Sequence, residues 1–231
     1  MPDENVPKAV AALWRDPAPT RRAGGLSRER IVAAAIEAAD ADGLAALSMG
    51  RLAERLGCGT MSLYRHVANK EELVAFMLCA ASGPPPAPAD GTDWRAALTD
   101  WACGLWDVYH RHPWILAASA TGPPVDPGQL AWLDAGLATL GGTGMDERDK
   151  LGAVLAVLHF ARGAAALAIE APADVEGPDY PGLLRSVIDA NRFPALASAL
   201  AAGAFDDGGE SHLGEFRSGL NQLLDGISLK V

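Results

Sequence analysis

A glycine-containing break in residues 52–74, LAERLGCGTMSLYRHVANKEELV, constrains the fold more than any other feature of the chain. Helix-like sequence stops at residues 57–59, Gly-Cys-Gly, and resumes immediately over residues 60–66. Two short helices joined by a three-residue turn with glycine form a helix-turn-helix. The second helix carries bulky and polar side chains opposite its apolar positions, Leu63 and Val67, so we expect it to do more than fill a core.

The rest of the chain also predicts helices. Ser27 and Gly43 are suited to cap the two ends of the first helix, and Ser48 and Asn69 to begin the second and the fourth. No segment shows a sustained alternation of β-branched residues, so we predict an all-α fold. After the first helix, we expect helices over residues 49–56, 60–66, from 70, 94–111, 114–120, 127–140, 147–170, 181–190, 194–201 and 212–227.

Composition divides the chain into three parts. Residues 1–26 are rich in Pro, Ala and Gly and are typical of a flexible arm. Residues 82–93, SGPPPAPADGTD, break any helix and mark the clearest boundary. We therefore expect a helix-turn-helix domain over residues 27–80 and a larger helical domain over residues 93–231.

The net charge of −10 is unevenly distributed and does not argue against a nucleic-acid partner. Residues 1–80 hold ten Lys/Arg and ten Asp/Glu, whereas residues 81–231 hold nine and nineteen. Residues 15–70 alone carry nine basic and six acidic side chains. Because phosphate contact is a local electrostatic event, this pattern favours a basic amino-terminal module on an acidic body.

We expect a cytoplasmic protein with no membrane segment. The three cysteines, Cys58, Cys79 and Cys103, lie far apart and show neither a disulfide framework nor metal-ligand spacing. The start of the chain lacks a basic segment followed by a long apolar run, so no signal peptide is predicted. No uninterrupted apolar stretch approaches the ~18 residues of a membrane span.

Double-stranded DNA is the expected partner of the helix-turn-helix. In the major groove, the side chains placed to reach base edges are Thr60, Met61, Ser62 and Arg65. Tyr64 and His66 are expected to contact phosphates, although Tyr64 would also suit a core. Ser48 and Lys70 begin helices and are natural phosphate anchors. Arg21 and Arg22 either enter the minor groove or belong to a dispensable tail.

Residues 27–76 resemble the DNA-binding domain of TetR-type transcriptional regulators. The most specific match is Leu-Tyr-Arg-His-Val-x-x-Lys-x-x-Leu, residues 63–73. Residues 112–124 and 216–227 resemble the C-terminal domain of the tetracycline-repressor subgroup. The resemblance implies a homodimeric repressor with a ligand-binding core, in which residues 147–170 and 212–227 form a four-helix dimer bundle. Unless these faces are internal core only, the interface would include Leu151, Leu155, Leu158, Leu220, Leu223 and Leu224.

Tryptophans mark a candidate pocket for a small hydrophobic or aromatic effector, between the helices at 94–111, 127–140 and 147–170. An indole has an apolar body and one N–H donor, which suits an aromatic-ligand pocket as well as an ordinary core. A lone arginine in an apolar helix more often pairs with a carboxylate than with a ligand. The acidity of this half favours a neutral or cationic ligand. The candidate lining residues are Trp101, Trp106, Trp114, Trp132, His159, Phe160 and Arg162.

We expect no cofactor, no metal and no catalytic residue. The tetracycline repressor itself uses a histidine to hold a metal–drug complex, and the matching stretch here, residues 117–124, has none. Ser119, His159 and Asp126 include the residue types of a catalytic triad, but no G-x-S-x-G elbow accompanies them. The remaining alternative is a helix-turn-helix protein whose C-terminal domain is structural or answers to a protein partner.

Overall fold

The computed structural model describes residues 13–14, 25–119, 124–170, 180–206 and 212–231, and within them the chain is helical and contains no strand. The all-α prediction is confirmed. A 3-10 turn, η1 (Leu44–Ala46), follows the first long helix. In chain order the α-helices are α2 (Arg28–Asp42), α3 (Met49–Arg55), α4 (Thr60–Leu63), α5 (Lys70–Ala81), α6 (Trp94–Arg111), α7 (Trp114–Ala118), α8 (Pro127–Thr139), α9 (Glu147–Glu170), α10 (Tyr180–Val187), α11 (Pro194–Ala201) and α12 (His212–Ser228).

The predicted helix caps form in the amino-terminal half. The side chain of Ser27 accepts a hydrogen bond from the Arg30 backbone N–H, and Ser48 accepts one from Arg51. Asn69 accepts one from the Glu72 N–H at 2.7 Å. Gly43 ends α2 with φ at 78°, a left-handed value that favours glycine. Side-chain caps satisfy N–H groups that a helix start leaves unpaired, so local sequence fixes these ends.

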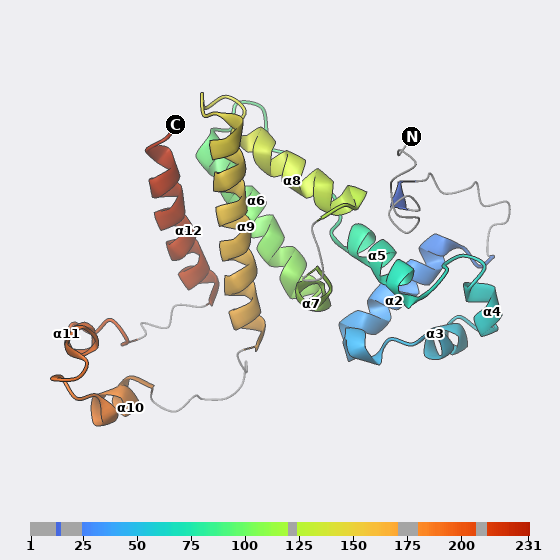
Figure 1. Ribbon diagram of the computed structural model, residues 1–231, viewed down its shortest axis with the longest axis horizontal. Coiled ribbons are helices and arrows are strands. Elements are labelled where there is room, and N and C mark those ends of the chain that lie inside the picture. The colour runs from blue at the N-terminus through green and yellow to red at the C-terminus, as the bar shows by residue number, and fades with distance from the viewer. Residues whose placement is uncertain (1–12, 15–24, 120–123, 171–179, 207–211) are drawn as a thin grey trace.

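Helices α2 to α5 form one small module at the end of the molecule farthest from α12 (Figure 1). Its centre is apolar and closed, because Ile31, Leu63, Val67 and Leu73 have no exposed surface. Gly57 has φ at 66° in the turn between α3 and α4, a left-handed value that strains a side-chain-bearing residue. The turn therefore sets α4 across α3 while its apolar side faces the module core.

Helices α6, α8, α9 and α12 build the larger body (Figure 1). Trp101 on α6 and Phe216 on α12 are among its largest fully buried side chains. Gly136 on α8 allows close approach: a Cβ there would lie 2.9 Å from ring atoms of Trp101 and from Val154 on α9. Three helices thus meet at a position where only glycine fits without repacking.

Helix α9 has the length and composition to cross a membrane, and core helices of soluble proteins pass the same test. Only 22% of its most apolar window is buried in the single chain. One side packs against α6 and α12, whereas Gly152, Ala156, Gly163 and Leu167 face outward. Helix α9 is therefore only partly covered in the single chain.

Several predicted helix ends are wrong by a few residues. Helix α4 ends at Leu63 rather than at residue 66, because His66 N–H donates to Leu63 O in a tighter i to i+3 turn. Helix α7 ends at Ala118, and Ala120 lies outside the described residues. Helix α10 spans Tyr180–Val187 instead of 181–190. Frayed last turns of this kind depend on tertiary neighbours more than on local pattern.

Two side chains of the larger body share one acceptor on the small module. Asp40 Oδ1 on α2 accepts from Trp114 Nε1 at 2.7 Å and lies 2.8 Å from His112 Nδ1. A second junction lies between α5 and α8, where a Cβ on Gly128 would sit 2.4 Å from the carbonyl oxygen of Cys79. The two modules are therefore joined by close contacts as well as by the chain.

Trp132 on α8 connects the body to the end of α5. Its Nε1 lies 3.0 Å from both Ser82 O and Gly83 O. Its own carbonyl accepts from Trp101 Nε1 at 2.8 Å. A Cβ at Gly104 would lie 2.9 Å from its ring, so this glycine makes room for the indole.

We predict that Gly128→Ala separates α8 from α5 and lowers the free energy of unfolding by about 1–3 kcal/mol, the usual cost of overpacking. Gly50→Ala is the matched control, since a Cβ on Gly50 meets nothing within 4 Å. The free energy of unfolding of that variant is expected to rise by up to ~1 kcal/mol, because alanine has a higher helix propensity than glycine. Urea unfolding followed by circular dichroism measures both, and a Gly128→Ala protein as stable as wild type would contradict the close contact.

Candidate DNA-binding surface and ligand cavity

One face of the α4 segment is turned to solvent. Leu63 and Val67 are completely buried on the core side. Met61 is 77% exposed and Tyr64 is 44% exposed, so Tyr64 belongs to the surface rather than to the core. The exposed residues of the segment are Thr60, Met61, Tyr64, Arg65 and His66. Polar groups on a protruding helix are what major-groove recognition needs.

Ser62 is half-buried and has a positioning contact. Its hydroxyl oxygen accepts from Arg65 Nη2 at 3.0 Å. The contact restrains an otherwise flexible guanidinium one helical turn away. An arginine held in place loses less side-chain entropy when it meets a guanine edge or a phosphate.

The predicted phosphate anchors lie at helix starts. Ser48 is exposed at the start of α3, and Lys70 is half-buried at the start of α5. Helix starts carry free N–H groups and partial positive charge, which favours an anion. Arg21 and Arg22 lie outside the described residues. Of the predicted arm, Trp14 is described, and its Nε1 donates to Val125 O at 3.0 Å.

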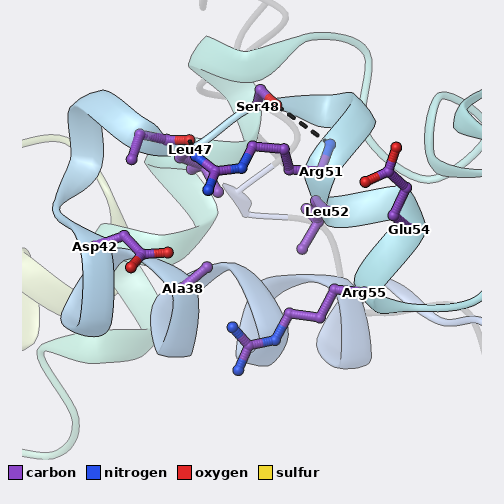
Figure 2. A pocket seen from close by; sticks show the side chains of 9 residues that line it. Ala38, Asp42, Leu47, Ser48, Arg51, Leu52, Glu54 and Arg55 are labelled. Atoms are coloured by element: carbon purple, nitrogen blue, oxygen red, sulfur yellow. Dashed lines mark hydrogen bonds between the residues drawn. The ribbon is translucent and has the colours of Figure 1, made fainter.

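A hollow of about 260 Å³ lies beside this surface, between the end of α2, η1 and α3. Figure 2 shows Ser48 above Arg51 on one side and Ala38 with Asp42 on the other. Arg51 donates to Ala46 O at 3.3 Å, and Arg55 pairs with Glu37 at 3.0 Å. Both of its arginines are engaged within the module and its lining also carries Asp42 and Glu54, so we assign no ligand to it.

A larger cavity of about 530 Å³ lies in the C-terminal body. It is bounded by α6, α7, α8 and α9, which agrees with the predicted position between the helices at 94–111, 127–140 and 147–170. Ligand cavities typically measure about 300–1,000 Å³ and are mostly apolar with a few polar groups. The lining residues are Ser82, Leu105, Val108, Tyr109, Ile115, Ser119, Pro124, Gln129, Trp132, Leu133, Leu155, Leu158, His159 and Arg162.

Two polar side chains of the cavity, Arg162 and Ser119, are held by the backbone and by each other. Arg162 Nη1 donates to Ser119 Oγ at 2.7 Å, and its Nη2 donates to Leu116 O. Ser119 in turn donates to Ile115 O at 2.7 Å. Burial raises the pKa of Tyr109, an effect that the Arg162 charge opposes, so the phenol stays protonated at neutral pH.

Three of the predicted ligand residues line the cavity, namely Trp132, His159 and Arg162. Trp101, Trp106, Trp114 and Phe160 are not among the described lining residues and pack elsewhere. Trp106 stacks on Phe216 with ring centroids 4.6 Å apart, and Phe160 stacks on the same ring at 5.7 Å. These contacts join α6, α9 and α12, while Trp101 is buried against Trp132 and Trp114 bonds to Asp40.

Sequence reasoning missed Tyr109 and Gln129. Tyr109 lies one turn beyond Leu105 on the buried face of α6, so its apolar spacing was the available signal. Gln129 lies in the first turn of α8, where its N–H donates to the capping Asp126 at 2.9 Å. Nothing in the local pattern distinguishes its side chain from a solvated one.

The predicted dimer residues divide into three groups. Leu151 is exposed on α9, and Leu223 is half-buried on α12. Leu155 and Leu158 line the cavity instead. Leu220 and Leu224 are 1% and 0% exposed within one chain. A side chain with no remaining surface has none to give to a partner.

The described residues hold no cluster of metal ligands, and Ser119 is not arranged as a nucleophile within them. They contain no group of three or more His, Cys, Asp or Glu side chains able to hold a metal ion. Ser119 and His159 both line the cavity, but the Ser119 hydroxyl is engaged by Ile115 O and Arg162. A nucleophilic serine needs a base as its hydrogen-bond acceptor, not a backbone carbonyl.

Comparison with known proteins agrees with this geometry. Residues 31–77 match the family model of bacterial regulatory proteins of the tetR family, and residues 87–231 match the tetracyclin repressor-like C-terminal domain. The HTH-type transcriptional repressor DrrR1 of Streptomyces coeruleorubidus is 32% identical over 98% of this chain and 87% of its own length. The class D tetracycline repressor protein of Escherichia coli is 30% identical over 89% and 91%.

A solved structure shows the same fold with a ligand bound. The TetR family protein ActR of Streptomyces coelicolor, in complex with (S)-DNPA, superposes with a TM-score of 0.73. The two sequences are 25% identical, and the match covers 88% of this chain and 98% of ActR. With its helix-turn-helix, its cavity and both family models matched, the chain belongs to the TetR family of DNA-binding transcriptional regulators, with a tetracycline-repressor-like C-terminal domain.

Proposed function

We propose that the protein is a ligand-responsive repressor that binds a palindromic operator as a homodimer and is released by a small hydrophobic or aromatic ligand. One observation carries the proposal: a solvent-facing α4 and a ligand-sized cavity occur in one chain and are joined by packed helices. DrrR1 is named a transcriptional repressor, and ActR binds (S)-DNPA in its crystal structure. A protein of this kind works at the chromosome, in the cytoplasm, and needs no catalytic group.

The proposed roles are assigned to successive segments of the chain. Residues 27–80 would bind DNA, residues 93–231 would bind the ligand and the second subunit, and residues 1–26 would form an arm. Two α4 helices of a dimer would enter successive major grooves, whose spacing is about 34–36 Å. Arg65, restrained by Ser62, would read a base edge, and Ser48 and Lys70 would position the module on phosphates.

Substitutions on this surface should separate base reading from phosphate contact. Arg65→Ala is expected to relax specificity at one base position at a cost of about 1–3 kcal/mol, while Lys70→Ala weakens all sequences alike and lowers the salt slope by about one. Arg148→Ala, an exposed site on α9, is the control for lost charge. Gel shifts on an operator selected from random duplexes measure this, and no preference for any palindrome would contradict the proposal.

Dimerisation is proposed to use the outward face of α9 together with α12. Leu167 is 72% exposed and shares this face with Gly152, Ala156 and Gly163, whose small side chains allow close helix approach. The face is mostly apolar, with His159 as an exposed polar member, and the single chain leaves it uncovered. A second copy related by a two-fold axis would bury it against itself.

Leu167→Glu is therefore expected to shift the protein from dimer to monomer, since two buried carboxylates would face each other near the symmetry axis. Met61→Glu adds the same charge at an exposed apolar site on α4 and should stay dimeric. Sedimentation velocity measures the oligomeric state of both variants. Dimers of equal stability in both would show that α9 is not the interface.

Ligand and DNA sites are proposed to communicate through Trp132. Its ring lines the cavity, and its N–H holds the carbonyls of Ser82 and Gly83 at the end of α5. A ligand against this ring would displace α5 and with it the separation of the two α4 helices. By linkage, DNA must weaken ligand binding by the same factor by which the ligand weakens DNA binding. Such a coupling free energy is typically ~1–3 kcal/mol.

A ligand found by screening aromatic compounds for quenching of tryptophan fluorescence should lower operator affinity about 5- to 150-fold. Trp132→Phe should still bind the ligand, but the loss of operator affinity should shrink, because the donor to α5 is gone. Trp94→Phe on α6 is the matched control. A tight ligand without effect on operator affinity would instead favour a structural or partner-regulated C-terminal domain.

A further inference from the structure

We propose that the effector is an aromatic or polycyclic acid whose anionic group pairs with Arg162. This inference deepens the proposed function, since it assumes that the C-terminal cavity is the effector site. It also reverses the expectation from composition, which favours a neutral or cationic ligand because residues 81–231 hold nineteen acidic and nine basic side chains.

The charge of the cavity differs from the charge of its domain. Arg162 is the one side chain among the described lining residues that carries a permanent charge, and none of them is a carboxylate. Charges on the outer surface are screened by water and salt over about 8–10 Å. A ligand inside the cavity therefore experiences Arg162 more strongly than the distant acidic surface.

Arg162 has no carboxylate partner within the described part of the chain. Its recorded hydrogen bonds end on neutral oxygens, the Ser119 hydroxyl and the Leu116 carbonyl. Asp126 caps α8 and is not among the lining residues, and Asp107 and Asp134, which adjoin lining residues in sequence, are exposed. A half-buried guanidinium with only neutral partners is stabilised by an added anion.

The neighbouring lining groups fit the same ligand. Tyr109 keeps its proton and can donate, and the Gln129 amide is a second donor on the cavity wall. Leu105, Leu133 and Leu158 supply apolar surface for a flat ring system. A molecule with an aromatic body and one acidic group would contact both the hydrogen-bond donors and the apolar residues that line the cavity.

Two fluorescent probes with the same skeleton test this. 1-Anilinonaphthalene-8-sulfonate carries an anion, and N-phenyl-1-naphthylamine lacks it. Arg162→Met should weaken sulfonate binding about tenfold to a hundredfold, as expected for a charged hydrogen bond, and leave the neutral probe within about twofold. Arg148→Met, which removes the same charge from an exposed site on α9, should change neither.

A substitution that fills the cavity tests whether the two probes bind there. Leu133→Trp should abolish binding of both, and sulfonate binding that survives this variant would overturn the proposal by placing the anion site elsewhere. Equal losses of both probes in Arg162→Met, or no loss, would overturn the charge preference while leaving a working cavity. If neither probe binds wild type, the cavity is no ligand site, and the proposed function fails with it.

A comparison on wild type alone covers the case in which Arg162→Met does not fold. 2-Anthroate and its methyl ester differ only at the acid group. The acid should displace a cavity-bound probe at a lower concentration than the ester, by about tenfold or more. An ester that competes as well as the acid would overturn the proposal.

Discussion

The indole of Trp132 occupies the position on which the two halves of the molecule depend. Its N–H holds the two carbonyls that end α5, its carbonyl holds Trp101 in the body, and its ring forms part of the cavity wall. Buried polar groups must be paired, so the indole cannot turn without leaving donors or acceptors unsatisfied. This requirement fixes α8 relative to α5 and so gives the cavity a defined shape.

Local chemistry made much of the fold predictable. The hydroxyls of Ser27 and Ser48 and the amide of Asn69 cap helices as expected, because capping depends on residues within three positions of each other. The apolar spacing of Leu63 and Val67 likewise placed the opposite side of α4 in solvent. The cavity also lies between the helices that the tryptophan-rich segments indicated, at residues 94–111, 127–140 and 147–170.

Which residues line the cavity was less predictable, because this depends on how the helices are rotated about their axes. Trp101 and Trp106 lie on one helix five residues apart, yet one packs toward α8 and the other toward Phe216 on α12. Leu155 and Leu158 share α9 with Leu151, but only Leu151 is exposed. Periodicity shows that a helix has an apolar face and does not show which neighbour covers each part of it.

Helix α9 presents different residues to the cavity and to its outward side, which bears on how the protein can evolve. Leu155, Leu158 and Arg162 face the cavity, while Gly163 and Leu167 face outward on the same helix. Under the proposed function, substitutions that alter ligand preference and substitutions that alter subunit pairing would therefore arise separately, residue by residue. A rigid helix nevertheless transmits any shift of its axis to both faces. In a dimer built on the outward face, the two cavities would lie back to back, and occupancy of one would be felt by the other.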